Sequence, residues 1–207
     1  MKKMYKGMLL VLCAILLVVA SVMGTLAYLQ DKTGTVTNTM TIGKVAIALD
    51  EAKVDLYGKK LNANGNVYTG ADGETLAERV MKNDYKLVPG ASYTKDPTIH
   101  VEAGSEACWV FVKIDNGIKD IIEENTVEGQ MTKWTCIDTV NGIWAYNEKA
   151  VADQDVVVFT SFKIKGEANI TGFAGKTIDV TAYAVQAEGF ANAKAAWDAT
   201  FGAPTNS

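Results

Sequence analysis

The segment 108–114, with the sequence CWVFVKI, constrains the fold more than any other part of the chain. Successive side chains of a β-strand point to opposite faces, so Trp109 and Phe111 share one face while Val110 and Val112 share the other. Both faces are apolar, and a strand of this kind is stable inside a sheet that is covered on both sides. We therefore expect this segment to be a buried strand within a larger sheet.

Other segments of the chain read as short strands separated by turns rich in glycine and asparagine. A series of short strands with such turns is typical of antiparallel sandwiches and jelly rolls. We predict an all-β fold, an antiparallel jelly-roll-like β-sandwich with short helices. The expected strands, including one that runs without a break over 156–164, cover residues 42–49, 98–102, 108–114, 131–137, 142–146, 156–164 and 177–186.

Three segments have helical patterns. Near the end of the chain, Phe190, Ala193, Trp197 and Phe201 recur at helical spacing and form one apolar stripe. This pattern predicts a C-terminal helix that packs on the sandwich. Shorter helical segments are expected at 74–82 and at 118–124.

Residues 1–27 have the composition of a secretory signal peptide. Three lysines precede an unbroken apolar run over residues 8–23, and the small residues Thr25 and Ala27 fit a signal peptidase site. We place the cleavage between Ala27 and Tyr28, which predicts a secreted protein. The alternative is an uncleaved membrane anchor, because sixteen apolar residues are close to the minimum length of a spanning helix.

Cleavage there leaves 180 residues, a length that suits one domain. Within them, residues 28–39 are polar and rich in threonine, and we separate them from a β-sandwich domain at 40–207. Such a segment either frays or becomes ordered by adding a strand to the edge of a sheet. The residues that would form this strand are Tyr28, Leu29, Thr33, Thr35, Val36, Thr37 and Thr39.

The charge of the chain argues against nucleic acid as a partner. The formal net charge is −4, and loss of residues 1–27 removes three lysines and no acidic residue, which makes it −7. Arg79 is the single arginine. Proteins that bind nucleic acid need clustered lysine and arginine to displace counterions from phosphates.

The sequence offers little for catalysis. A metalloprotease holds its metal with two or three histidine or acidic ligands, but this chain has one histidine, His100, and no His-Glu-x-x-His motif. The pattern of the segment 98–101 places His100 on a strand, where we expect it to face solvent or a hydrogen-bond partner. We therefore assign no catalytic, metal-binding or cofactor-binding residue.

Two further features leave alternatives open. Cys108 and Cys136 could form a disulfide outside the cell, although separately buried thiols are the simpler interpretation. The loop at 62–74 contains Asn62, Asn64, Asn66 and Asp72, but the glycine and the terminal glutamate of a calcium loop are out of place. Calcium at this loop is the weaker interpretation.

Several motifs resemble the TasA and camelysin family of exported bacterial proteins, which are processed by a SipW-type signal peptidase. At the amino end they are GTLAYLQD at 24–31 and NTMTIGKV at 38–45. In the middle they are YKLVPG at 85–90 and KDPTI at 95–99, and near the end AEGF at 187–190. None of these motifs is a catalytic signature, so the resemblance concerns family and export rather than chemistry.

The resemblance implies a jelly-roll fold and a structural subunit of extracellular biofilm matrix or surface fibres. Assembly would follow donor-strand exchange, in which residues 28–39 of one subunit pair with an open sheet edge of the next. The expected partners are other copies of the chain, a SipW-type signal peptidase and an accessory matrix protein. The alternatives are a camelysin-like surface metalloprotease, against which the single histidine argues, and a monomeric surface adhesin that uses exposed tryptophans.

Overall fold

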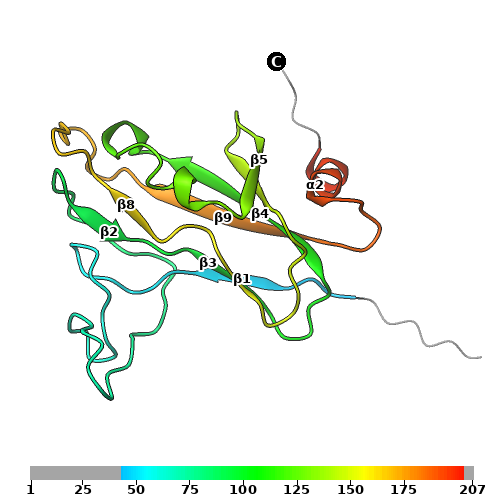
Figure 1. Ribbon diagram of the computed structural model, residues 1–207, viewed down its shortest axis with the longest axis horizontal. Coiled ribbons are helices and arrows are strands. Elements are labelled where there is room, and N and C mark those ends of the chain that lie inside the picture. Colours follow the sequence, from blue (N-terminus) through cyan, green and yellow to red (C-terminus); the bar gives the residue numbers. More distant parts are fainter. Residues whose placement is uncertain (1–42, 203–207) are drawn as a thin grey trace, which may run out of the picture. The chain divides into compact units, whose positions relative to one another are not determined.

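The computed structural model describes residues 43–202, so the expected signal peptide and residues 28–39 lie outside the described residues. The described residues form nine strands, two 3₁₀ turns and one α-helix (Figure 1). In chain order they are β1 (Ile47–Asp50), β2 (Ser92–Thr94), β3 (Thr98–Val101), β4 (Cys108–Asn116), η1 (Lys119–Ile121), η2 (Glu128–Gln130), β5 (Trp134–Asp138), β6 (Ile143–Tyr146), β7 (Asp155–Val157), β8 (Ser161–Lys163), β9 (Ile178–Gln186) and α2 (Ala193–Phe201).

These strands form three antiparallel sheets. The first has the order β1-β3-β7, the second pairs β2 with β8, and the third has the order β5-β6-β4-β9. One buried core contains side chains from all three sheets, such as Ile99 of β3, Phe162 of β8 and Val110 of β4. The sheets therefore pack together around a shared interior.

Strand β4 is covered on both faces, as its sequence predicts. Val110 and Val112 point into the core shared by the three sheets, and both are completely buried. On the opposite face, Trp109 and Phe111 belong to a second apolar cluster. Strand β4 lies between β6 and β9, so its backbone is paired on both edges as well.

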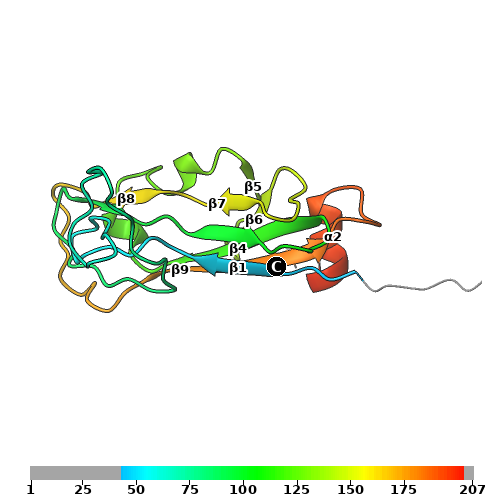
Figure 2. The ribbon, with the colours of Figure 1, turned by 90° about the horizontal axis from the view of Figure 1, so that it is seen from below.

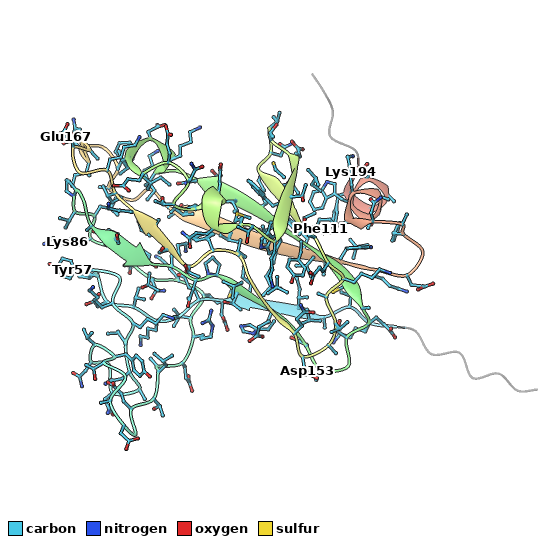
Figure 3. All side chains as sticks on the ribbon, viewed as in Figure 1. Tyr57, Lys86, Phe111, Asp153, Glu167 and Lys194 are labelled. Atoms are coloured by element: carbon cyan, nitrogen blue, oxygen red, sulfur yellow. The ribbon has the colours of Figure 1, made fainter. Side chains whose placement is uncertain are left out.

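The second cluster is closed by α2. Asn192 caps this helix by accepting a 2.9 Å hydrogen bond from the backbone N–H of Ala195. The ring of Trp197 lies 5.1 Å from that of Phe111 and 5.6 Å from that of Tyr183. Figure 3 labels Phe111 on β4 and Lys194 on the helix that covers it. The predicted C-terminal helix and its packing on the sheet are confirmed.

The expected strands at 131–137 and 142–146 are present, with shifted bounds, as β5 and β6, which pair as an antiparallel hairpin. The Asp138 carboxylate accepts hydrogen bonds from the backbone N–H groups of Val140 and Asn141, each 3.0 Å long. Gly142 then adopts a positive φ of 67°, and a Cβ there would lie 2.6 Å from the carbonyl oxygen of Ile114. The turn therefore requires glycine both for its backbone conformation and for its close approach to β4.

Two local predictions are wrong. The segment 74–82 is not helical, because Leu76 forms a β-bridge with Asn62 and Val80 forms one with Glu51. The expected strand at 156–164 is broken into β7 and β8, which belong to different sheets. Val158 and Phe159 lie between them and are both buried. The chain crosses from the first sheet to the second at this point, which ends the continuous strand.

The all-β antiparallel fold with a C-terminal helix is confirmed, while the jelly-roll arrangement of a sandwich stays a prediction. Within residues 43–202, no helix combines the length and the apolar character needed to cross a bilayer.

We expect the substitution Phe111→Ala to lower the free energy of unfolding by about 3–5 kcal/mol, because it leaves a cavity between β4 and α2. Urea unfolding at neutral pH measures the change. Val140→Ala serves as the control, since Val140 is 88% exposed and its loss should change stability by less than about 0.5 kcal/mol. Equal effects of the two substitutions would show that α2 does not stabilise the sheet.

Candidate functional site

Strand β1 uses only one of its two edges within the described residues. The N–H of Glu102 donates a 3.0 Å hydrogen bond to the carbonyl oxygen of Ala46. In an antiparallel pair the backbone groups of every second residue face the partner strand, so those of Ala48 and Asp50 also point toward β3. The backbone groups of Ile47 and Leu49 therefore point away from β3. Within residues 43–202, they have no backbone partner.

Strand β9 has an open edge of the same kind. The N–H of Gly117 donates to the carbonyl oxygen of Thr177, and the N–H of Ala187 donates to that of Ala107, both at 2.8 Å. These bonds show that the odd-numbered residues of β9 point their backbone N–H and C=O groups toward β4. The even-numbered residues point their N–H and C=O groups outward, and in the part of the chain described here no backbone group pairs with them. They are Ile178, Val180, Ala182, Ala184 and Gln186.

A groove of about 680 Å³ lies between these two strands. Leu49 and Asp50 of β1 form part of one wall, and Ile178 and Val180 of β9 form part of the other. Figure 2 shows β1 and β9 along the same side of the molecule. The buried ring of Phe162 also lines the groove. The groove thus reaches from two unpaired backbone edges to the apolar core.

The apolar side chains beside the groove are only partly covered. They pack against the core of the three sheets, yet each keeps some exposure to solvent. They are Val45, Ile47 and Leu49 on β1 and the segment before it, and Val180, Ala182 and Ala184 on β9. An added strand at either edge would cover part of this apolar surface and satisfy the backbone groups of that edge.

The open edge of β1 ends at Glu51. There the N–H of Glu51 donates to the carbonyl oxygen of Val80 and the N–H of Val80 donates back, both at 2.8 Å. The Glu51 side chain is 6% exposed and pairs with Lys95 at 2.7 Å, while Asn83 donates to it at 2.9 Å. Burial, together with the negative charges of Glu51 and Asp96, raises the pKa of Tyr85, which also lines the groove.

Next to this end of the groove, His100 joins the three strands of the first sheet. Its Nδ1 lies 2.6 Å from the carboxylate of Asp155 on β7, and its Nε2 lies 2.9 Å from that of Asp50 on β1. The guanidinium of Arg79 also donates to the Asp50 carboxylate. We call Asp50, Arg79, His100 and Asp155 the His100 clasp.

Arg79 extends this clasp along the start of β3. Its Nη2 donates to the carbonyl oxygen of Asp96 and to the hydroxyl of Thr98, each at 2.9 Å. The Asp96 carboxylate in turn accepts a 2.7 Å hydrogen bond from the N–H of Ala52 and pairs with Lys60 at 3.1 Å. The segment that follows β1 is therefore tied to β3 by charged side chains as well as by backbone pairing.

In the His100 clasp, the positive and negative groups stabilise each other's charged forms. Burial opposes a charge on His100, but the bonds to Asp50 and Asp155 outweigh it and raise the pKa of the imidazole. Burial likewise favours the neutral form of Asp50, yet the bonds from Arg79 and His100 lower the pKa of this carboxyl. Two carboxylates can each receive a ring N–H only from the charged imidazolium.

The prediction that His100 serves as a hydrogen-bond partner on a strand is confirmed. Both of its ring nitrogens face aspartates rather than a serine or cysteine nucleophile. Among the described residues, no group of three histidine, cysteine, aspartate or glutamate side chains is arranged to hold a metal ion.

The loop at 62–74 is arranged around N–H donors. The Glu74 carboxylate accepts hydrogen bonds from the side chain of Asn62 and from the backbone of Thr69 and Gly70, at 2.7 to 2.9 Å. These bonds, led by that from Asn62, lower the pKa of Glu74 to about 2. A calcium site would need these oxygens to face a cation instead.

Cys108 and Cys136 are both free thiols. Cys136 lies opposite Trp144, and Trp144 lies opposite Val112, four residues along β4 from Cys108. Two strand spacings and four residues separate the Cα atoms by roughly 16 Å, whereas a disulfide needs them within about 7 Å. Burial raises the pKa of both thiols.

The predicted site residues and the observed groove come from different parts of the chain. The cleavage site at Ala27 and Tyr28 and the assembly strand at 28–39 lie outside the described residues. The sequence did not indicate the clasp, because its members lie far apart in the chain. The only signal was that the single arginine and the single histidine both belong to it.

Comparison with known proteins gives no match: no family model, no curated protein and no solved structure is similar to this chain.

We expect Glu74→Gln to accelerate hydrogen exchange at the amides of Thr69 and Gly70 several-fold at pH 7, because a neutral amide oxygen accepts more weakly than a carboxylate. In the unaltered chain, the lowered pKa of Glu74 stabilises the loop above about pH 4.5, and this contribution is lost as the pH falls toward 2. Asp72→Asn, an exposed change in the same loop, is the control. If both variants exchange alike, Glu74 does not organise the loop.

Proposed function

We propose that this protein is a secreted structural subunit of extracellular biofilm matrix or surface fibres, as the resemblance to the TasA and camelysin family implies. The observation that carries the proposal is the apolar groove between β1 and β9, each of which has an unpaired edge within residues 43–202. In this proposal the groove accepts residues 28–39 of a neighbouring subunit as an added strand. Backbone hydrogen bonds supply the affinity, and alternating side chains set the register.

The dimensions of the two partners support this pairing. The nine residues of β9 extend over about 30 Å, and a strand of twelve residues extends over about 40 Å. The segment 28–39 contains no proline, so each of its residues can donate a backbone hydrogen bond. The bridge between Glu51 and Val80 closes the open edge of β1 and would set where the added strand ends.

Assembly of this kind is directional. Each subunit gives a strand through its amino-terminal segment and receives one in its groove, and head-to-tail contacts of this type form filaments rather than closed dimers. Cleavage between Ala27 and Tyr28 by a SipW-type signal peptidase would release the donor segment. An accessory matrix protein with a similar segment could start the fibre.

The two alternative functions have less support. A camelysin-like protease would need a metal ligand, and both ring nitrogens of His100 already face aspartates. An adhesin that stacks sugars on tryptophan would need exposed indole rings, but Trp109, Trp134 and Trp197 are at most 8% exposed, which leaves Trp144 alone as partly exposed among the four tryptophans.

Electron microscopy of purified residues 28–207 and 40–207 at equal concentration tests the proposal. We expect filaments only from the longer protein, because only it carries the donor strand. If both proteins remain folded monomers, self-assembly through residues 28–39 is wrong. Filaments from both would show that another surface drives assembly.

The variant Ala182→Pro tests the acceptor edge. The N–H of Ala182 points away from β4, so proline there removes a donor from the open edge and leaves the pairing with β4 intact. We expect this variant to fold and to lose filament formation, whereas the matched control Ala182→Val, which keeps its N–H, should retain it. Circular dichroism confirms folding. Filaments from a folded Ala182→Pro variant would exclude this edge of β9 as the docking site.

A further inference from the structure

We infer that the His100 clasp makes the acceptor groove pH-sensitive, so that fibre assembly is favoured while His100 is protonated and weakens when it loses its proton. This inference rests on the proposed donor-strand function, which it extends from the site of assembly to its regulation. It starts from the position of the clasp, because Asp50 is both a member of the clasp and part of the groove wall.

Strand β1 is short and has backbone pairing with one neighbouring strand within residues 43–202. It has four residues, and the strand with which it pairs is β3. The His100 clasp adds a connection across β3 to β7, from Asp50 through the imidazole to Asp155. The clasp thus adds a side-chain link to the backbone pairing of β1 with β3 and to the bridge between Glu51 and Val80.

The connection requires a charged ring. A neutral imidazole has one N–H and one lone pair, so it can donate to only one of the two aspartates and faces the other with its lone pair. Asp155 is 66% exposed and can turn toward solvent, while Asp50 is held by Arg79. Loss of the proton therefore breaks the bond to Asp155 and reduces the bond to Asp50 from a charge-assisted to a neutral one, which weakens the side-chain link between β3 and the β1 wall.

The charged groups around the ring set the pH range. Asp50 faces it from β1 and Asp155 faces it from β7, while Arg79 acts through Asp50, and Asp96 and Lys60 act through Arg79. The raised pKa of His100 means that its stabilising effect is complete below the pKa of a free histidine and is lost as the pH rises through the value in the fold. The lowered pKa of Asp50 preserves the carboxylate in mildly acidic solution.

The experiment uses the full chain, expressed with its own amino terminus, recovered from the culture medium and purified without a histidine tag. His100 is the only histidine, so its ring signals in NMR spectra report this one group without ambiguity. Thermal unfolding and filament yield are measured at pH 6 and pH 9 for the unaltered chain, for His100→Gln and for Asp155→Asn. Lys194→Gln, which breaks an exposed ion pair on α2, is the control for loss of charge.

We expect the NMR titration to give a pKa above that of a free histidine. The unaltered chain should lose roughly 2–4 °C in Tm between pH 6 and pH 9 beyond the change seen in His100→Gln, together with several-fold of its filament yield. Asp155→Asn should reduce both differences, and Lys194→Gln should reduce neither. Identical pH profiles for the unaltered chain and for both clasp variants would overturn the inference.

The remaining outcomes separate this inference from the proposed function. Filaments whose yield does not follow the titration of His100 would overturn the pH control and leave donor-strand assembly standing. If no filaments form at any pH although the Tm follows the titration, the assembly role and the pH control of assembly both fail, and the clasp is reduced to a stabilising contact. In an Asp155→Asn variant that folds, an unchanged pKa for His100 would exclude the geometry on which the inference depends.

Discussion

The burial of β4 on both faces is the constraint on which the rest of the fold depends. Its backbone needs a strand on each edge, and its two apolar faces need separate covers. Strands β6 and β9 meet the first need, and the shared core and α2 meet the second. This arrangement places β9 at the end of its sheet, where within residues 43–202 no strand is hydrogen-bonded to its outer edge.

An open edge is ordinarily a liability, because unpaired N–H and C=O groups can pair with any other chain. Proteins often protect such edges with charges that point inward or with proline. Here the inward side chains of β9 beside the groove are Val180, Ala182 and Ala184, which offer neither protection. The same is true of Val45, Ile47 and Leu49. Two unprotected edges that border one apolar groove are easier to explain as a binding site than as two separate defects.

Local sequence patterns predicted the elements that have a periodic pattern of apolar residues or that pair with a neighbour close by in the sequence. Strand β4, the hairpin of β5 and β6, and α2 belong to this group. The helix expected at 74–82 failed because Glu74 binds backbone N–H groups of its own loop, while Val80 pairs with Glu51, far back in the sequence. The clasp and the groove could not be predicted either. They join β1, β3, β7 and β9. The periodic pattern of a single strand does not indicate which other strands lie next to it in the fold.

The clasp and the end of the groove occupy the same place for a physical reason. The edge of β1 closes where Val80 pairs with Glu51, and the side chain of Arg79, the preceding residue, reaches from this bridge to the carboxylate of Asp50. The backbone bridge that ends the open edge thus also positions the guanidinium of Arg79, which donates to the Asp50 carboxylate that faces His100. A strand that enters the groove would end against this bridge, beside the one side chain whose ordinary pKa lies near neutrality. In the proposed assembly, Arg79 and Val80 would therefore set both the position at which an added strand stops and the position at which the fold senses pH.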